Sequence, residues 1–273
     1  MKILVLGCNG MAGHLISLYF KEQGHEVVGF ARQQSSLLDN TIIGDASDMT
    51  FINCIGLLNQ FAENNKAMAV LLNGYLPHYL VEITKDTKTR VIHMSTDCVF
   101  AGNDGPYDED ALPNGATFYD RSKAVGEINN DKDLTFRNSI VGPDIKNSGI
   151  GLFNWFMKQK GHISGFTGAI WTGVTTYTLA KAMDQALKEN LTGLYNLVNN
   201  QSINKFDLCS LFNKYFRGGE VEINPDDKLQ LDKSLRCKRT DFSFVVSSYE
   251  QQIKEMREWI DAHPSLYPHY NVK

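Results

Sequence analysis

The sequence predicts an α/β protein, in which a doubly wound, Rossmann-like parallel sheet is joined to a small C-terminal region. Three observations predict this class. Short apolar runs alternate with helical patterns, a glycine-rich turn follows the first apolar run, and the alternation loosens beyond residue 140. Alternating strands and helices are typical of a parallel sheet that helices cover on both faces.

The expected strands are short apolar runs, as in strands that a parallel sheet buries on both faces. In chain order they span residues 2–6, 26–30, 51–55, 91–94, 134–137 and 193–197. One helix runs from the glycine turn to about Gln23, and others are expected over residues 64–84, 119–129 and 176–189. Pro77 should bend the second helix or begin a new helical segment there.

The C-terminal part of the chain is less regular. We expect a helix over residues 203–216, entered through Asn204, and an amphipathic helix over residues 248–263. The polar stretch 221–247 between them is expected to be irregular.

The breaks in this alternation suggest where the domains divide. Residues 1–142, completed by residues 172–200, are expected to form the Rossmann-like domain. Residues 143–171 and 201–273 are expected to form the small region, lying over the carboxyl edge of the sheet, where ligands bind in folds of this kind.

Composition argues against several classes of function. The 273 residues carry a net charge of −4, so neither nucleic acid nor an acidic membrane surface is expected as the main partner. The five cysteines are scattered and the seven histidines dispersed, so we expect reduced cysteines and no metal site. The chain begins directly with a strand and has no apolar run of membrane-spanning length, which predicts a cytoplasmic protein.

Three glycines lie between the first strand and the first helix. Glycines in this context allow a tight turn and the close approach of a pyrophosphate, which then lies at the helix N-terminus. We therefore expect this turn to bind a dinucleotide. The candidate contacts in the turn are Gly7, Asn9, Gly10, Met11 and Gly13.

The residues after the second strand indicate which dinucleotide is bound. An acidic residue there would hold a ribose 2′-hydroxyl, whereas this chain has Arg32, which can bind a 2′-phosphate. NADP(H) is therefore the preferred cofactor, and NAD(H) remains open. Only 20 residues separate Phe30 from Phe51, so Thr41–Ile43 is either a short edge strand or no strand, and the adenine side of the pocket is expected to be abbreviated.

Tyr119 and Lys123 are four residues apart, which places them on one face of a helix. An ammonium beside a phenol lowers the phenol pKa from about 10 toward neutrality, which yields a usable proton donor and acceptor. Thr96 follows an apolar strand, where its hydroxyl can bind a substrate oxygen beside the tyrosine.

Together these motifs resemble the extended short-chain dehydrogenase/reductase superfamily, and within it the dTDP-4-dehydrorhamnose reductase family. The most specific part of the resemblance lies between Thr96 and Lys123. The segments that carry the resemblance are Ser95–Gly102, Pro106–Glu109, Pro113, Tyr119–Lys123 and Gly126–Glu127, with Asn53–Gly56, Ala62–Glu63, Asn73 and Arg137–Ser139.

The resemblance implies roles at the matching positions. Tyr119 would donate a proton to the C4 oxygen of a 4-keto-sugar nucleotide while the nicotinamide delivers a hydride to C4. Lys123 would hold the nicotinamide ribose, and Thr96 would orient the keto oxygen. The backbone groups of Asn53, Cys54 and Ile55 would line the cofactor groove.

Further residues are candidates for the substrate side of the site. Asp97 matches the family pattern and Asn138 lies in its Arg-Asn-Ser segment, although physics alone assigns neither a role. Trp171 could stack on a base or a sugar, as could Trp155 and Phe166, while packing in the core is the favoured interpretation of these rings. Cys98 stands where related dehydratases have a glutamate, which favours reduction over dehydration.

The function predicted from these features is NADPH-dependent reduction of the C4 keto group of a nucleotide-linked 4-keto-6-deoxy sugar, for cell-surface polysaccharide synthesis. Two alternatives stay open: a sugar-nucleotide epimerase or epimerase-reductase, and a non-catalytic NADP-binding regulatory protein. The expected partner is the nucleotide sugar, with no nucleic acid and no membrane, and a homodimer remains open.

Overall fold

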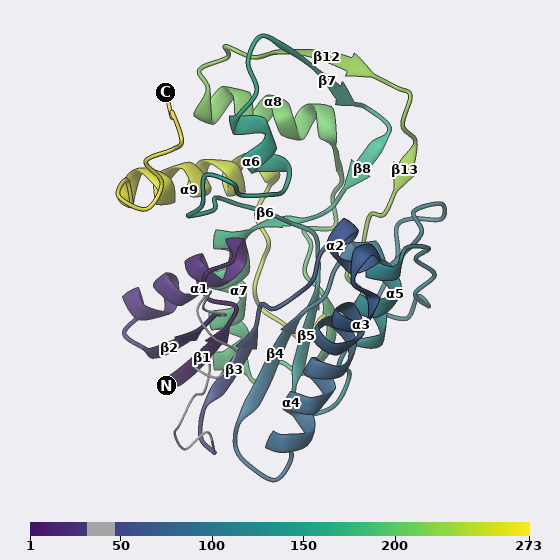
Figure 1. Ribbon diagram of the computed structural model, residues 1–273, viewed down its shortest axis with the longest axis vertical. Coiled ribbons are helices and arrows are strands. Elements are labelled where there is room, and N and C mark those ends of the chain that lie inside the picture. Colours follow the sequence, from purple (N-terminus) through teal and green to yellow (C-terminus); the bar gives the residue numbers. More distant parts are fainter. Residues whose placement is uncertain (32–46) are drawn as a thin grey trace.

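The computed structural model describes residues 1–31 and 47–273 (Figure 1). Its centre is a six-stranded sheet in which every neighbouring pair is parallel. The strand order is β10 (Gly193–Asn196), β5 (Leu134–Arg137), β4 (Arg90–Met94), β3 (Thr50–Asn53), β1 (Lys2–Leu6) and β2 (Glu26–Phe30). The predicted doubly wound, Rossmann-like fold is confirmed.

Helices cover both faces of this sheet because successive strand side chains point to opposite sides. In β1, Ile3 and Val5 join the core beneath helices α1 (Met11–Glu22) and α7 (Thr176–Glu189), whereas Leu4 and Leu6 face α4 (Leu76–Thr84). The same side as α4 carries the remaining helices of this half (Figure 1). These are α2 (Asn59–Asn64), α3 (Lys66–Ala69), the π-helix η1 (Val70–Tyr75) and α5 (Phe118–Val125).

The helix predicted over residues 64–84 is three consecutive pieces, α3, η1 and α4. Pro77 lies in the first turn of α4, as expected of a residue that starts a new segment. A π-turn in mid-helix is often found at a functional site. Here it contains Asn73, which is fully buried against α5.

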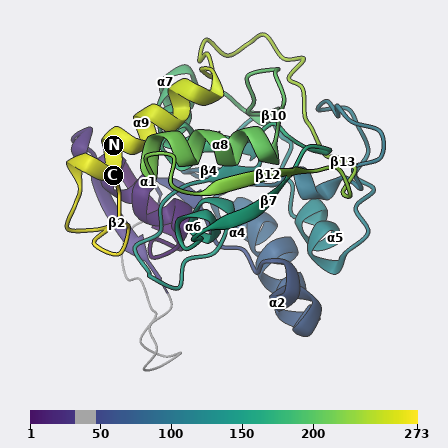
Figure 2. The ribbon, with the colours of Figure 1, turned by 90° about the horizontal axis from the view of Figure 1, so that it is seen from above.

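A second set of elements lies over the carboxyl ends of the sheet strands (Figures 1 and 2). It contains the helices α6 (Leu152–Met157), α8 (Lys205–Phe216) and α9 (Tyr249–Ala262), and the short strands β7 (His162–Phe166), β8 (Ala169–Trp171), β11 (Ile203–Asn204), β12 (Glu222–Asp226) and β13 (Leu231–Asp232). A further pair, β6 (Ile140–Val141) with β9 (Val174–Thr175), connects it to the sheet region.

The expectation that residues 221–247 are irregular is wrong in its first half. β12 pairs in parallel with β7, and β13 pairs with β8. Both strands are polar and partly exposed, so an apolar run does not mark them in the sequence. They form because each partner strand supplies backbone hydrogen bonds, which depends on tertiary structure.

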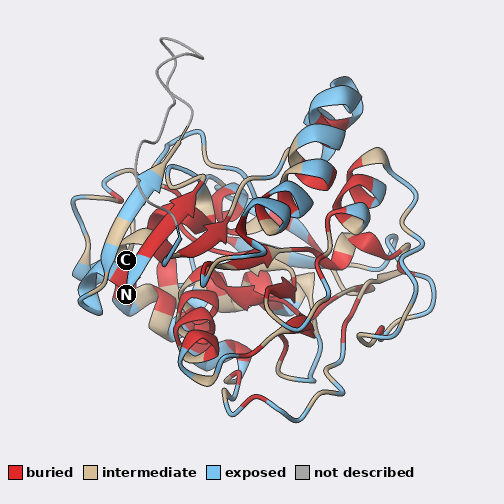
Figure 3. Cartoon of the chain, turned by 90° about the horizontal axis from the view of Figure 1, so that it is seen from below, coloured by how far each residue is buried: buried red, intermediate tan, exposed pale blue. Residues whose placement is uncertain are grey.

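The core is continuous from the sheet into the second set of elements (Figure 3). It also includes the last part of the chain, which returns to α1. Tyr267 donates from its hydroxyl to Nε2 of His14 at 2.9 Å, and the hydroxyl of Tyr270 accepts from the backbone N–H of Asp144 at 2.8 Å. Among the helices of the described ranges, none has the length and apolar character needed to span a bilayer.

Arg32 and Thr41–Ile43 lie in the segment 32–46, outside the described residues, so the expectations for the 2′-phosphate and for the edge strand stay predictions.

Candidate active site

The glycine turn brings the start of α1 close to the end of β1. Gly7 has φ of +83°, a conformation that glycine adopts without strain. A Cβ on Gly13 would lie 2.2 Å from the carbonyl oxygen of Gly7, so only glycine allows α1 to start this close to β1. Gly10 caps α1 without a side-chain hydrogen bond, and the first turn of α1 contains no acidic residue. The first N–H groups of the helix and the positive end of its dipole are therefore available to an anion.

The end of β3 lies directly beside this turn. A Cβ on Gly7 would be 3.2 Å from the backbone of Cys54, and Ile55 is equally close. Asn9 and Gly10 are exposed, and Met11 is partly buried next to Gly151. The turn and the end of β3 therefore lie side by side, with the side chain of Asn53 buried beneath them.

Thr96 and Asp97 follow β4 at the carboxyl edge of the sheet, and both are buried. The Thr96 hydroxyl accepts from the backbone N–H of Cys98 at 3.2 Å and donates to Asp97 at 3.1 Å. Burial raises the pKa of Asp97, against the opposing effects of its bond from Thr96 and of Lys233 and Lys205 nearby.

Tyr119 is on α5 and is 6% exposed. Burial raises the pKa of its phenol far above the usual range, and Cys98 and Asp97 raise it further, while a hydrogen bond with Thr96 lowers it. The expectation that Lys123 lowers this pKa is therefore wrong in the ligand-free protein, because desolvation dominates and because the lysine points elsewhere.

Lys123 lies one helical turn beyond Tyr119 and is 4% exposed. Its Nζ donates to the carbonyl oxygen of Met94 at 2.6 Å and lies 3.3 Å from Nε2 of His93. Burial lowers the pKa of Lys123 to about 8, although Glu127 and Cys54 oppose the shift.

Helix α5 is held at both ends by residues outside the predicted site. At its N-terminus Thr117 and Asp120 form a reciprocal capping box, and Glu63 accepts from the backbone N–H of Phe118 at 2.6 Å. Asn73 donates to Ser122 at 3.0 Å and bonds both backbone groups of Leu57, which ties the helix to the chain after β3. Tyr119 and Lys123 are thereby fixed relative to the chain after β3.

A buried ion pair supports the far end of α5. Arg137, at the end of β5, donates to both oxygens of Glu127 at 2.8 and 2.6 Å, and Ser95 donates to the same carboxylate at 2.6 Å. The pair joins the ends of β4, β5 and α5, and both side chains are at least nine-tenths buried.

Of the substrate candidates, Asn138 is 2% exposed and its Oδ1 has no hydrogen-bond partner among the described residues, so it can accept from a ligand.

Trp171 is 5% exposed, and its ring folds over Gly173, where a Cβ would lie 2.0 Å from it. It packs against Tyr249 in the core, which supports the packing interpretation over stacking on a base.

A comparison with known families decides the assignment. The model of the RmlD substrate binding domain matches residues 1–270. The chain belongs to this family.

Curated relatives of this RmlD family chain match over part of their length. A probable low-salt glycan biosynthesis reductase of Haloferax volcanii is 32% identical over 143 residues, 46% of this chain and 48% of that protein. Methionine adenosyltransferase 2 subunit beta of Xenopus laevis is 26% identical over 161 residues, 53% of this chain and 48% of that protein. The chain thus spans about half the length of the curated relatives it matches.

Solved structures of the family share the whole fold. A dTDP-4-dehydrorhamnose reductase from Clostridium acetobutylicum superimposes with a TM-score of 0.76 at 18% identity, over 96% of this chain and 100% of that one. Another from Bacillus anthracis, in complex with NADP, gives 0.74 at 17% identity, over 95% and 99%.

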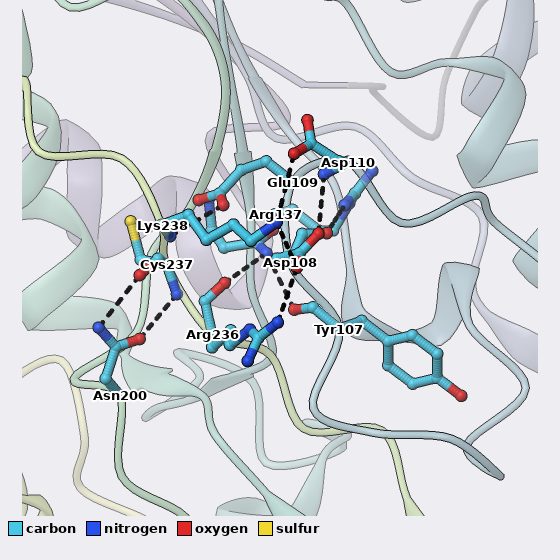
Figure 4. Close-up of polar contacts among 10 residues, drawn as sticks. Tyr107, Asp108, Glu109, Asp110, Arg137, Asn200, Arg236, Cys237 and Lys238 are labelled. Carbon is cyan, nitrogen blue, oxygen red and sulfur yellow. Dashed lines mark hydrogen bonds and ion pairs between the residues drawn. The ribbon is translucent and has the colours of Figure 1, made fainter.

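Residues 107–110 are linked to residues 236–238 by ion pairs and hydrogen bonds (Figure 4). The carboxylate of Asp108 forms ion pairs with Arg236 at 3.1 Å and with Lys238 at 2.9 Å. Glu109 accepts a hydrogen bond from the backbone N–H of Lys238 at 3.1 Å. Asn200 bonds both backbone groups of Cys237. The segment after Pro106, noted in the sequence for its resemblance, thus holds residues 236–238 in place.

Proposed function

We propose that this protein is an NADPH-dependent reductase of the C4 keto group of a nucleotide-linked 4-keto-6-deoxy sugar. One observation carries the proposal: Thr96, Tyr119 and Lys123 converge at the carboxyl end of β4, and Lys123 lies close to Cys54 beside the glycine turn. Membership of the RmlD family and the relatives described as reductases support it.

The proton for this reaction would come from Tyr119. Reduction needs a phenol that still carries its proton, and burial keeps Tyr119 in that form. Thr96, which lies close enough to lower the pKa of the tyrosine, would hold the substrate carbonyl against it. A bound nicotinamide would supply the hydride, and Lys123 would face its ribose.

Cys98 favours simple reduction. Burial raises the pKa of its thiol to about 12, with Asp97 adding to the effect, so the thiol stays protonated near neutral pH. A protonated thiol is a poor base for the elimination of water. An epimerase would need such a base, and uptake of solvent deuterium beside the keto group would favour that alternative.

The nucleotide and diphosphate would lie under residues 143–171 and 201–273, which we propose as the substrate-binding region. Lys205 and Lys233 carry positive charge toward Asp97 at the mouth of the site. Asn138 offers its unpartnered oxygen to a ligand hydroxyl or amide. We further propose a cytoplasmic enzyme whose product enters polysaccharide synthesis.

The test is NADPH consumption with dTDP-, UDP- and GDP-linked 4-keto-6-deoxyhexoses. Tyr119→Phe should lower kcat at least 100-fold with little change in NADPH affinity, because only the proton donor is lost. The exposed Tyr79→Phe serves as the control. Absence of turnover by the wild-type protein with all these sugars contradicts the proposal.

A regulatory role is the second candidate, and one observation favours it. The chain resembles methionine adenosyltransferase 2 subunit beta, which that name describes as a subunit of another enzyme. A regulator would keep its biological activity in the Tyr119→Phe variant, whereas a reductase would lose it.

A further inference from the structure

Behind Lys123, two buried side chains continue it as a polar column, and the predicted mechanism uses neither of these side chains. Asn53 and His93 are 0% exposed and face each other as register partners on the adjacent parallel strands β3 and β4. Asn53 Nδ2 lies 3.2 Å from His93 Nδ1, and His93 Nε2 lies 3.3 Å from Lys123 Nζ. Each nitrogen must therefore act as either donor or acceptor, and the assignments depend on one another.

The backbone N–H of Ile55 fixes the orientation of the Asn53 side-chain amide. The N–H of Ile55 donates to Oδ1 of Asn53 at 3.1 Å. The Asn53 amide is thereby oriented with its NH₂ group toward His93, since the reverse orientation would place two donors together at Ile55.

The remaining assignments follow along the column. An NH₂ group only donates, so His93 Nδ1 accepts and the ring hydrogen of a neutral imidazole is on Nε2. Burial is the largest cause that lowers the pKa of His93 well below its usual range, so the ring is neutral without a charge on Lys123. The Nε2–H then faces Nζ of Lys123, and only an uncharged amine has a lone pair to accept it.

We propose that His93 is a positioning residue, oriented by Asn53, that donates to Lys123 and holds it as an uncharged amine in the ligand-free protein. Lys123 keeps its own donated bond to Met94, so every contact of the column then has one donor and one acceptor. A charged Lys123 would create one donor–donor contact in a fully buried place, which is costly.

The charged groups around Lys123 do not by themselves decide whether it is protonated. The titratable groups that face Lys123 are His93 on β4, Cys54 after β3 and Glu127 after α5, and His78 on α4 faces His93. Burial lowers the pKa of Lys123 to about 8, even though Glu127 and Cys54 raise it. A hydrogen bond donated to the amine lowers it further, because that bond exists only in the neutral form.

This inference deepens the proposed function, and only its consequence for turnover rests on that function. Above the pH at which Lys123 titrates, Tyr119 holds its proton and Lys123 lacks one in the resting site. Lys123 can then accept a proton when a bound ribose hydroxyl or the tyrosine supplies one.

The test uses ligand-free protein labelled with 15N-histidine and 13C-lysine, titrated by NMR. His93→Gln and Lys123→Met identify the two signals. We expect His93 to show the Nε2–H tautomer and Lys123 to titrate at or below pH 8. In His93→Gln the side-chain oxygen can accept from an ammonium, so the proton affinity of Lys123 should rise at least tenfold.

His78→Gln is the matched control, because His78 lies outside the column and bonds the backbone oxygen of Val125. His78→Gln should change the pH at which Lys123 titrates far less than His93→Gln does. An Nδ1–H tautomer at His93, a wild-type Lys123 protonated above pH 9, or an unchanged titration in His93→Gln would each overturn the proposal. The wild-type spectrum decides even where His93→Gln does not fold, and no sugar substrate is needed, so failure of the proposed reductase activity is a separate result.

Discussion

At the scale of single residues, burial controls the chemistry of the site more strongly than neighbouring charges do. Tyr119 and Lys123 are both almost fully enclosed, and each is shifted toward its neutral form. Desolvation disfavours the charged state of both groups, so the ligand-free site contains a phenol and a lysine that loses its proton readily.

Lys123→Met should stabilise the protein at neutral pH. The lysine pKa is 10.5 in an unfolded chain and about 8 in the folded protein, so the unfolded chain binds more protons between these values and stability rises with pH across that window. Lys123 therefore destabilises the fold below pH 8, and this penalty is gone above pH 10.5.

The expected gain for Lys123→Met at pH 7 is at most roughly 3 kcal/mol, reduced by the bond to Met94 that is lost. Urea unfolding of both proteins at pH 7 and pH 9.5 measures it. A stability difference of the same size at both pH values would contradict the assignment.

At the scale of elements, the site depends on how α5 begins. Thr117→Ala removes the hydroxyl that accepts from the N–H of Asp120 at 3.1 Å and should cost about 1 kcal/mol. Because α5 has only eight residues and carries Tyr119 and Lys123, we expect turnover to fall as well.

Ser248→Ala is the matched control, since Ser248 caps the remote helix α9 in the same way. Both variants should lower Tm by about 2–4 °C, which calorimetry measures, but only Thr117→Ala should lower kcat. Equal kcat values in the two variants would show that the cap has no influence on the site.

The sequence is sufficient to predict the elements that local pattern determines. The glycine turn, the six strands and the spacing of Thr96, Tyr119 and Lys123 all follow from short-range signals. The buried contacts of His93 and Glu127 escaped prediction because their partners come from other elements. The same holds for β12, whose strand conformation depends on β7.

At the scale of the whole molecule, the returning C-terminal segment closes the core. Tyr270→Phe removes the acceptor for the buried N–H of Asp144 and the bond that its hydroxyl donates to Asn154. We expect a loss of about 1–3 kcal/mol in the free energy of unfolding, as for other buried groups left unpaired.

The exposed Tyr75→Phe is the control for this change and should alter stability by no more than about 0.5 kcal/mol. Urea unfolding compares the two variants with the wild type. A negligible loss in Tyr270→Phe would mean that water replaces the missing hydroxyl.

The bond between Tyr267 and His14 also sets an order of events during synthesis. The two residues are 253 positions apart, so at about 5–20 residues per second a ribosome needs roughly 10–50 s to produce the second partner after the first. Throughout that interval α1 is present without the hydroxyl that later bonds its histidine. Helix α1 therefore reaches its final set of contacts only after Tyr267 has been synthesised.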